Sequence, residues 1–225
     1  MTGHTLLRVL YGGTFDPVHN GHLAVARHAR DALRAEVHLM PAADPPHKGP
    51  THADAEQRAE MLALAIGEEP GLSVDLRELR RNGPSYTIDT LRGLREEIGA
   101  AAPLALLVGA DSFLALPTWR AWRELFDYAH FVVAERPGNG IARDLPEALA
   151  QVAEGRWADS GVELGRLAAG RILLLEQPLH PESASEIRRR IRAGEPWRDQ
   201  VPPPVAAYIA DHGLYGARTV TSGPL

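Results

Sequence analysis

The stretch LYGGTFDPVHNGH, from Leu10 to His22, decides how the rest of the chain is interpreted. An apolar run ends in two adjacent glycines, Gly12 and Gly13, and His19 and His22 then flank a third glycine. In an open parallel sheet, ligands bind beyond the carboxyl ends of the strands, and glycine there lets a phosphate approach the backbone. The stretch therefore predicts a strand, a phosphate-binding turn and the start of a helix whose amides face the same place.

The two histidines leave three interpretations open. The spacing is neither GxGxxG nor GxxxxGK[ST], so the usual dinucleotide fingerprint and the P-loop are excluded. Two histidines without a nearby third ligand make a weak zinc site. Imidazole groups can instead stabilise charge that develops on a polyphosphate during transfer. The residues alone also fit a plain glycine turn with two surface histidines.

Composition narrows the class of protein. The 225 residues carry a net charge of −5, which does not suggest a general nucleic-acid binder. The absence of cysteine excludes disulfides, thiolate catalysis and cysteine-based zinc sites. The first residues lack the basic region of a signal peptide, and no apolar stretch is long enough to span a bilayer. We expect a cytoplasmic protein with neither a nucleic-acid nor a membrane partner.

Apolar runs of strand length alternate with stretches of helical spacing, which predicts an α/β fold with an open parallel sheet and helices on both faces. The expected strands are Leu6–Tyr11, Val37–Met40, Leu72–Leu76, Leu104–Val108, Phe131–Ala134 and Ile172–Leu175. The expected helices are Gly21–Leu33, Ala53–Ile66, Thr87–Ile98, Trp119–Phe126, Leu145–Ala153, Ser185–Arg192 and Val205–His212. We expect one domain over 1–216, with 138–170 as a candidate insertion, and a disordered tail over 217–225.

The segment GGTFDPVHNGH resembles the first signature of the nucleotidyltransferase superfamily, which carries an HxGH motif, and is most similar to bacterial nicotinate mononucleotide adenylyltransferases. Further similar segments are PPHK (Pro45–Lys48), RAEML (Arg58–Leu62), RNGPSYTIDTL (Arg81–Leu91), LLVGADSFLALPTW (Leu106–Trp119), HFVVAERPG (His130–Gly138), SASEIRRRI (Ser183–Ile191) and PPPVAAYIADHGLY (Pro202–Tyr215). The resemblance implies a Rossmann-like sheet. It also implies transfer of the AMP part of ATP to nicotinate mononucleotide, with Mg²⁺, giving deamido-NAD and pyrophosphate.

The resemblance assigns the polyphosphate end of the site. The side chains expected to meet polyphosphate charge, and so to act in catalysis, are His19, His22, Lys48 and Arg188. The backbone expected to cradle phosphate or adenosine is that of Gly12, Gly13, Thr14 and Phe15. Asp16 has two interpretations, fixing the loop or approaching a metal through water. We expect no direct metal ligand, because Mg²⁺ would be carried by the ATP phosphates.

The segment SASEIRRRI resembles the family's second signature, SSTxIR, with Ala184 in place of a hydroxyl residue. Ser183, Ser185 and Arg188 are retained, and the helix start remains able to receive phosphate. The arginines beyond the signature are expected to form a solvated face or a subunit contact, so a homo-oligomer remains open.

The segment SYT enters a predicted helix. Ser85 or Thr87 is a candidate N-cap, and Asp89 suits the first turn, so capping alone explains these residues. The resemblance adds that Ser85, Tyr86 and Thr87 lie against the pyridine nucleotide and help to hold its carboxylate, which free N–H groups at a helix start receive well.

Two tryptophans, Trp119 and Trp122, are three apart on a predicted helix, a spacing that usually indicates core. The resemblance implies that Trp119 stacks on the pyridine ring, and we assign Trp122 to the core.

Two strand ends supply further candidates for the nucleotide site. Gly109 allows close approach, and Asp111 stands where a ribose-binding carboxylate would in a doubly wound fold, or where an N-cap would. The resemblance places both in the ATP site. Arg136 follows another apolar strand and is expected to touch nucleotide.

Two rival functions remain. One is a transferase of the same superfamily with another acceptor, such as phosphopantetheine, or a cytidylyltransferase, against which the SYT segment and Trp119 argue. The other is a nucleotide-binding regulator without catalysis, against which the two histidines and the Ser-x-Ser-x-x-Arg pattern argue. The expected partners are therefore ATP and nicotinate mononucleotide.

Overall fold

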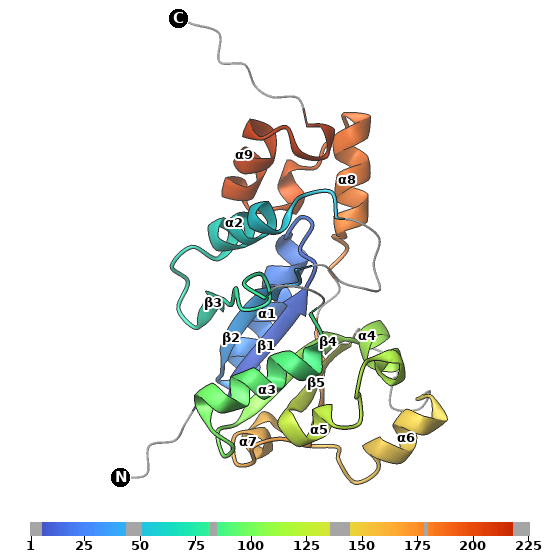
Figure 1. Ribbon diagram of the computed structural model, residues 1–225. Helices are drawn as coiled ribbons and strands as arrows, with labels where there is room; N and C mark the ends of the chain where they lie inside the picture. Colours follow the sequence, from blue (N-terminus) through green and yellow to red (C-terminus); the bar gives the residue numbers. More distant parts are fainter. Residues whose placement is uncertain (1–5, 44–50, 82–84, 136–144, 178–179, 218–225) are drawn as a thin grey trace, which may run out of the picture.

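The computed structural model describes residues 6–43, 51–81, 85–135, 145–177 and 180–217 (Figure 1). Lys48 and Arg136, two of the expected site residues, lie outside these ranges. So do residues 218–225 of the expected disordered tail, which therefore stays a prediction.

A six-stranded sheet of order β3-β2-β1-β4-β5-β6 forms the centre of the protein, and every pairing is parallel. The strands are β1 (Arg8–Gly13), β2 (Glu36–Pro41), β3 (Leu72–Val74), β4 (Leu104–Gly109), β5 (His130–Glu135) and β6 (Ile172–Glu176). The strand order reverses between β1 and β4, where Leu10 pairs with Leu106. Such a reversal opens a crevice beyond the carboxyl ends of the two strands, which is where ligands bind in this architecture.

Helices cover both faces of the sheet, which confirms the predicted fold class. They are α1 (Asn20–Leu33), α2 (Ala55–Ile66), α3 (Thr87–Ile98), α4 (Ala110–Leu114), α5 (Leu125–Tyr128), α6 (Glu147–Ala153), α7 (Gly161–Leu164), α8 (Ala184–Ala193) and α9 (Pro203–Asp211). Apart from one predicted helix, the expected elements appear with boundaries shifted by at most two residues. No helix in the described ranges is long and apolar enough to cross a membrane.

The core divides along the alternation of each strand. On β4, Ala105 and Leu107 join the cluster formed with α1, α2, α8 and α9, whereas Leu104, Leu106 and Val108 join the cluster formed with α3 to α6. Successive strand residues point to opposite faces, so a strand covered on both sides becomes a continuous apolar run. This two-sided burial explains why β4 and β5 were recognised in the sequence as continuous apolar runs.

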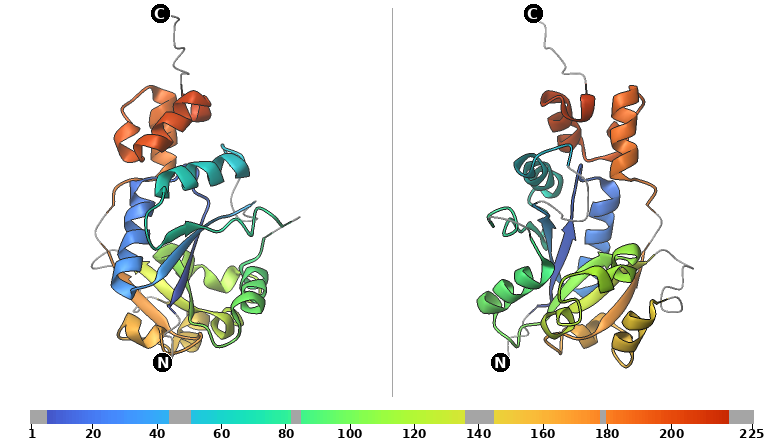
Figure 2. Two further views of the ribbon diagram at one scale, coloured as in Figure 1. Left: turned by 90° about the vertical axis from the view of Figure 1, so that its left-hand side faces the viewer. Right: turned by 45° about the vertical axis from the view of Figure 1, so that its right-hand side comes forward.

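Helices α2, α8 and α9 gather at one end of the molecule, away from α6 and α7 (Figures 1 and 2). Helix α2 packs against α9, and α8 packs against the short turn Leu214–Gly216 that follows α9. The turn Leu214–Gly216 is thereby brought to the loop after β1, where the Tyr215 hydroxyl donates to Asp16.

The helix predicted over Trp119–Phe126 is wrong. A 3-10 turn at Leu116–Thr118 is followed by turns, and only α5 is regular. Ala121 has φ of +50°, a left-handed conformation that no right-handed helix can include. Trp119 and Trp122 therefore do not share a helix face. Trp122 is buried in the core, as predicted, while Trp119 is half-buried.

The candidate insertion contains more structure than the sequence indicated. Helix α6 matches the predicted helix, but α7 was not anticipated. Leu149 and Ala153 are buried in one core cluster and Leu164 in the other, so the described part of the segment packs into the main body. The division into one domain with an insertion stays a prediction.

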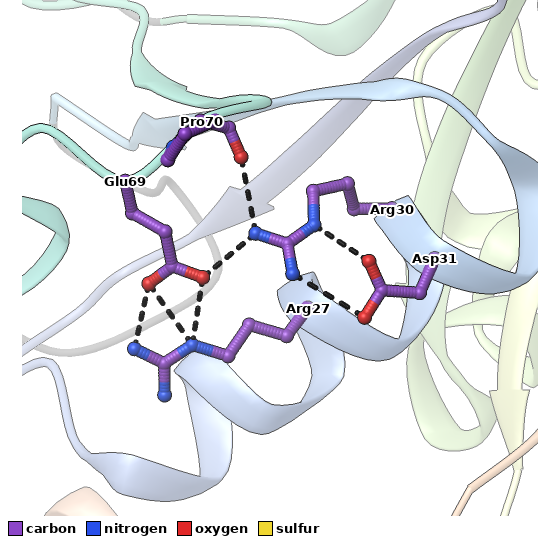
Figure 3. A network of polar contacts seen from close by, with 5 residues as sticks. All are labelled: Arg27, Arg30, Asp31, Glu69 and Pro70. Carbon is purple, nitrogen blue, oxygen red and sulfur yellow. Dashed lines mark hydrogen bonds and ion pairs between the residues drawn. The ribbon is translucent and has the colours of Figure 1, made fainter.

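An ion-pair network ties the second half of α1 to the approach of β3 (Figure 3). Arg27 meets both oxygens of Glu69, at 2.7 and 3.0 Å, and Arg30 donates to Glu69 at 2.7 Å and to the carbonyl of Pro70 at 3.0 Å. A Cβ at Gly71 would lie 2.7 Å from Cδ of Arg30, so glycine leaves room for this arginine. The network helps to fix α1 against the edge of the sheet.

Candidate active site

A cavity of about 370 Å³ opens at the carboxyl ends of β1 and β4, where the strand order reverses. Three segments that are distant in sequence share its wall. They are Gly12–Thr14 at the end of β1, Gly109 with Asp111 and Ser112 at the end of β4, and Ser85–Thr87 at the start of α3. Trp119 and Arg120 line it as well. The fold therefore brings the glycine turn, the end of β4 and the expected pyridine-binding residues into one cavity. Six other expected residues that the structure describes do not line it: His19, His22, Arg188, Phe15, Ser183 and Ser185.

The two glycines at the end of β1 have different roles. A Cβ at Gly12 would meet only Cε of Met40, at 3.9 Å, so this position stays open to the cavity. A Cβ at Gly13 would lie 2.8 Å from Cζ of Phe15, whose buried ring folds back beneath the turn. The Phe15 ring packs edge-on against His22, with centroids 4.9 Å apart. Phe15 thus supports the turn from the core, while Gly12, Gly13 and Thr14 line the cavity.

His19 and His22 form a stacked pair at the start of α1. Their ring centroids lie 3.7 Å apart with an interplanar angle of 26°, and His19 is the N-cap residue, with φ of −143°. The backbone N–H of His19 donates to Nδ1 of His22 at 3.3 Å. A nitrogen that accepts a hydrogen bond carries no proton, so this contact assigns the proton of neutral His22 to Nε2.

His19 is buried and neutral. Burial, reinforced by the nearby His180, lowers the pKa of His19 to about 4. Its Nδ1 is buried and has no hydrogen-bond partner within the described residues. Buried polar atoms in folded proteins are nearly always paired, so this nitrogen marks a place where a bound group would supply the missing partner.

Steric crowding explains why a glycine occupies the third position of the HxGH motif. A Cβ at Gly21 would lie 3.1 Å from Nδ1 of His19 and 3.3 Å from Cβ of His180. Glycine therefore lets both side chains lie against the first turn of α1. No sequence signal pointed to His180, which is far from the motif in the chain.

Asp16 holds the loop in place. Its Oδ2 accepts from the backbone N–H of His52 at 2.9 Å, and its Oδ1 accepts from the N–H of Ala53 at 3.1 Å and from the Tyr215 hydroxyl at 2.8 Å. The contacts favour the loop-fixing interpretation of this residue. Burial together with the Asp16 charge raises the pKa of Tyr215, so that hydroxyl remains a donor at neutral pH.

Arg188 reaches the same loop from α8. Its Nη1 donates to the carbonyl oxygen of Asp16, and its Nε is buried without a hydrogen-bond partner among the described residues. Ser183 is the N-cap of α8, and its hydroxyl accepts from the N–H of Glu186 at 3.2 Å, while Ser185 is exposed. Arg189 and Arg190 pair with Glu186 on the surface, as expected of a solvated face.

The start of α3 differs from the prediction. Its N-cap is Tyr86, whose carbonyl accepts from the N–H groups of Asp89 and Thr90, so neither Ser85 nor Thr87 is the N-cap. Ser85, Tyr86 and Thr87 all line the cavity, and the Ser85 hydroxyl is buried without a partner within the described ranges. The first N–H groups of a helix have no partner inside it, so this segment offers donors to the cavity.

At the end of β4, Gly109 and Asp111 both line the cavity. Gly109 is the N-cap of α4 and Asp111 lies in its first turn, so the N-cap interpretation of Asp111 is wrong. The carboxylate is exposed, and its expected contact with ribose stays a prediction.

Two residues near the site had no role in the sequence interpretation. Arg58, from the RAEML segment, is fully buried and donates to the carbonyl oxygens of Thr14, Ala42 and Ala43 at 2.7–2.8 Å, which joins the ends of β1 and β2. Glu78 lines the cavity, accepts from the Thr90 hydroxyl at 3.0 Å, and has its pKa raised by burial.

A metal ion held by the protein itself would need several carboxylate or imidazole ligands close together. Among the described residues, no group of three or more histidine, aspartate or glutamate side chains is arranged to hold a metal ion. Asp16, the candidate nearest the HxGH motif, already accepts three hydrogen bonds.

Comparison with known proteins agrees with this geometry. Residues 10–190 match the cytidylyltransferase-like family. A "Probable nicotinate-nucleotide adenylyltransferase" of Stenotrophomonas maltophilia (strain K279a) is 56% identical over 218 residues, which cover 95% of this chain and 98% of that relative. One of the same name from Marinobacter nauticus is 47% identical, covering 95% and 99%. The chain therefore belongs to the nicotinate-nucleotide adenylyltransferase family.

A solved structure shares the fold at much lower identity. The Plasmodium falciparum nicotinic acid mononucleotide adenylyltransferase complexed with NaAD superposes with a TM-score of 0.69 and 17% identity, over 93% of this chain and 97% of that one. At that identity the likeness concerns the fold alone.

Proposed function

We propose that the protein transfers the adenylyl group of ATP to nicotinate mononucleotide, giving deamido-NAD and pyrophosphate for NAD biosynthesis. The observation that carries this proposal is that one cavity joins the glycine turn at the end of β1 to the start of α3 and Trp119. A dinucleotide product needs both of these regions within one site. The names of relatives up to 56% identical support the same reaction.

The proposed chemistry is direct in-line displacement. A 5′-phosphate oxygen of nicotinate mononucleotide attacks the α-phosphorus of ATP. The bond from that phosphorus to the bridging oxygen breaks, and pyrophosphate leaves with the electron pair. The attacking phosphate is already an anion, so the protein need supply neither a nucleophile nor a general base. Catalysis then consists of positioning and of stabilising charge on the polyphosphate.

The polyphosphate would lie at the start of α1. His22, whose Nε2 carries the proton, is a donor there. Nδ1 of His19 is unpartnered within the described residues, as is Nε of Arg188, whose Nη1 donates to the Asp16 carbonyl in the loop before α1. The lowered pKa keeps His19 neutral in the free protein, so its contribution to phosphate binding would be a hydrogen bond and not a positive charge. We assign Lys48 to the ATP phosphates as well. Mg²⁺, bound to those phosphates, would draw negative charge from the leaving pyrophosphate.

The pyridine end would lie at the start of α3. Trp119 would stack on the ring, and N–H groups at the start of α3 would receive the carboxylate. A carboxamide presents one acceptor and an NH₂ that would face a donor. We expect nicotinate mononucleotide to be preferred to nicotinamide mononucleotide by at least about 10²-fold in kcat/KM.

Release of pyrophosphate tests the proposal. The protein is supplied with Mg²⁺ and ATP or CTP, and with nicotinate mononucleotide, nicotinamide mononucleotide or phosphopantetheine. Release that requires ATP and nicotinate mononucleotide supports the proposal. Release with another acceptor or with CTP indicates a different transferase. Nucleotide binding without release in any combination indicates a regulator.

A further inference from the structure

Arg120 is a charged side chain at the cavity to which the sequence motifs gave no role. It follows Trp119 directly and lines the same wall. Its guanidinium lies over the ring of Tyr86, with Cζ 4.7 Å from the ring centroid. Tyr86 is the N-cap residue of α3. The cation is therefore held beside the helix start at the pyridine end of the cavity.

We propose that the Arg120 side chain reads the charge on the pyridine substituent, and so helps to select nicotinate over nicotinamide mononucleotide. The inference rests on the proposed function and deepens it. A guanidinium remains charged and presents only donors, which a carboxylate can accept in pairs. A carboxamide gains no ionic attraction, and its NH₂ group cannot accept. The side chain thus adds charge discrimination to the donors of the α3 backbone.

No other cationic side chain in the described part of the chain lines the cavity, and Arg120 is not tightly paired with an acidic one. The other charged residues lining the cavity in the described part of the chain are Glu78 and Asp111, both acidic. Asp89 approaches Nη1 of Arg120 only to 4.0 Å and is shared with Arg92, at 3.7 Å. The Arg120 side chain is 61% exposed, so solvent screens its charge and its effect is modest.

The chain offers a matched control three residues further on. Arg123 also holds its guanidinium over an aromatic ring, that of Trp122, at 4.4 Å. Arg123 is exposed and does not line the cavity. Replacing either arginine by methionine removes the same charge and the same cation–π contact. A difference between the two variants therefore reports the position of Arg120 at the cavity.

The experiment measures kcat/KM for nicotinate and nicotinamide mononucleotide at saturating Mg-ATP in the wild type, R120M, R120K and R123M. We expect R120M to lower the preference for nicotinate about tenfold, equivalent to about 1.4 kcal/mol, mainly through KM for nicotinate mononucleotide. R120K keeps the charge and should retain most of the preference, and R123M should retain all of it. Added salt should reduce the preference of the wild type more than that of R120M.

Several outcomes would overturn the inference. An unchanged preference in R120M removes Arg120 from recognition. An equal loss in R120K and R120M indicates packing on Tyr86 instead of charge, and an equal loss in R123M indicates net charge alone. Each of these outcomes is read against an active wild type. A wild type that forms no deamido-NAD refutes the proposed function itself, so the two failures are distinguishable.

Discussion

The two ends of helix α1 differ in whether their polar side chains have hydrogen-bond partners. At its start, Nδ1 of His19 is buried and unpartnered within the described residues, as is Nε of Arg188, which contacts the loop before the helix at Asp16. In its second half, Arg27 and Arg30 share Glu69 in a closed network at the surface (Figure 3). A folded protein rarely leaves buried polar atoms unpaired unless a ligand or water completes them. The contrast supports our proposal that the polyphosphate binds at the start of α1, while the second half of the helix serves as scaffold.

Replacing His22 by alanine should produce the largest effect on the reaction. Loss of one donor aimed at developing charge usually costs about 10²–10³-fold in kcat. Affinity for ATP should fall much less, because many other groups hold the nucleotide. Steady-state kinetics, with a thermal melt to establish folding, provide the measurement. A near-normal kcat would remove His22 from the mechanism and weaken the contrast between the two ends of α1.

Acid should destabilise the protein through His19. Its pKa is about 4 in the folded protein and about 6.5 when unfolded, so the unfolded state binds the proton first as pH falls. The stabilisation is fully present above about pH 6.5 and is lost toward pH 4, by up to about 3 kcal/mol. Denaturant unfolding at pH 7, 5.5 and 4 would measure it. The variant His19→Gln should lose the part of the pH dependence that lies between pH 6.5 and 4, and an unchanged profile would contradict the assignment.

Replacing Trp119 by alanine extends the comparison to the other side of the cavity. A half-buried side chain that lines the cavity should act on binding, so we expect the pyridine nucleotide to bind more weakly by about 1–3 kcal/mol, with KM for ATP almost unchanged. Trp122→Ala is the matched control, because it empties the core and should cost about 3–5 kcal/mol of stability. If Trp119→Ala unfolds the protein or weakens both substrates equally, Trp119 is a core residue.

Replacing Glu69 by glutamine should have the smallest effect. The variant weakens the ion pairs of Arg27 and Arg30, but both lie near solvent, so the free energy of unfolding should fall by about 0.5–1 kcal/mol. The rate of pyrophosphate release should not change. Denaturant unfolding and the kinetic assay, made side by side, check both expectations. A large loss of activity would show that the scaffold end of α1 also controls the site.

The sequence determined the sheet and the glycine turn at the end of β1. Strands β4 and β5 are covered on both faces and therefore appear as continuous apolar runs, while the helices repeat apolar residues at their own period. The GGTFDPVHNGH stretch alone located the turn after β1, because glycine at a strand end and a helix start are local features. The fold class followed from such local patterns, whereas Ser85, Tyr86, Thr87 and Trp119 were expected at the site only through the family resemblance.

Tertiary structure decided what no local pattern contains. Tyr215 reaches Asp16 across 199 positions of the chain, and His180, which follows β6, lies against the first turn of α1 close to His19. The left-handed conformation of Ala121 prevents the helix that the sequence predicted over Trp119–Phe126. The N-cap of α3 is Tyr86 and not Ser85 or Thr87. Periodicity reports which side of an element is buried, but not which distant element covers it. The pairing of polar groups depends on that second fact, so only the folded chain shows which of them are left for a ligand.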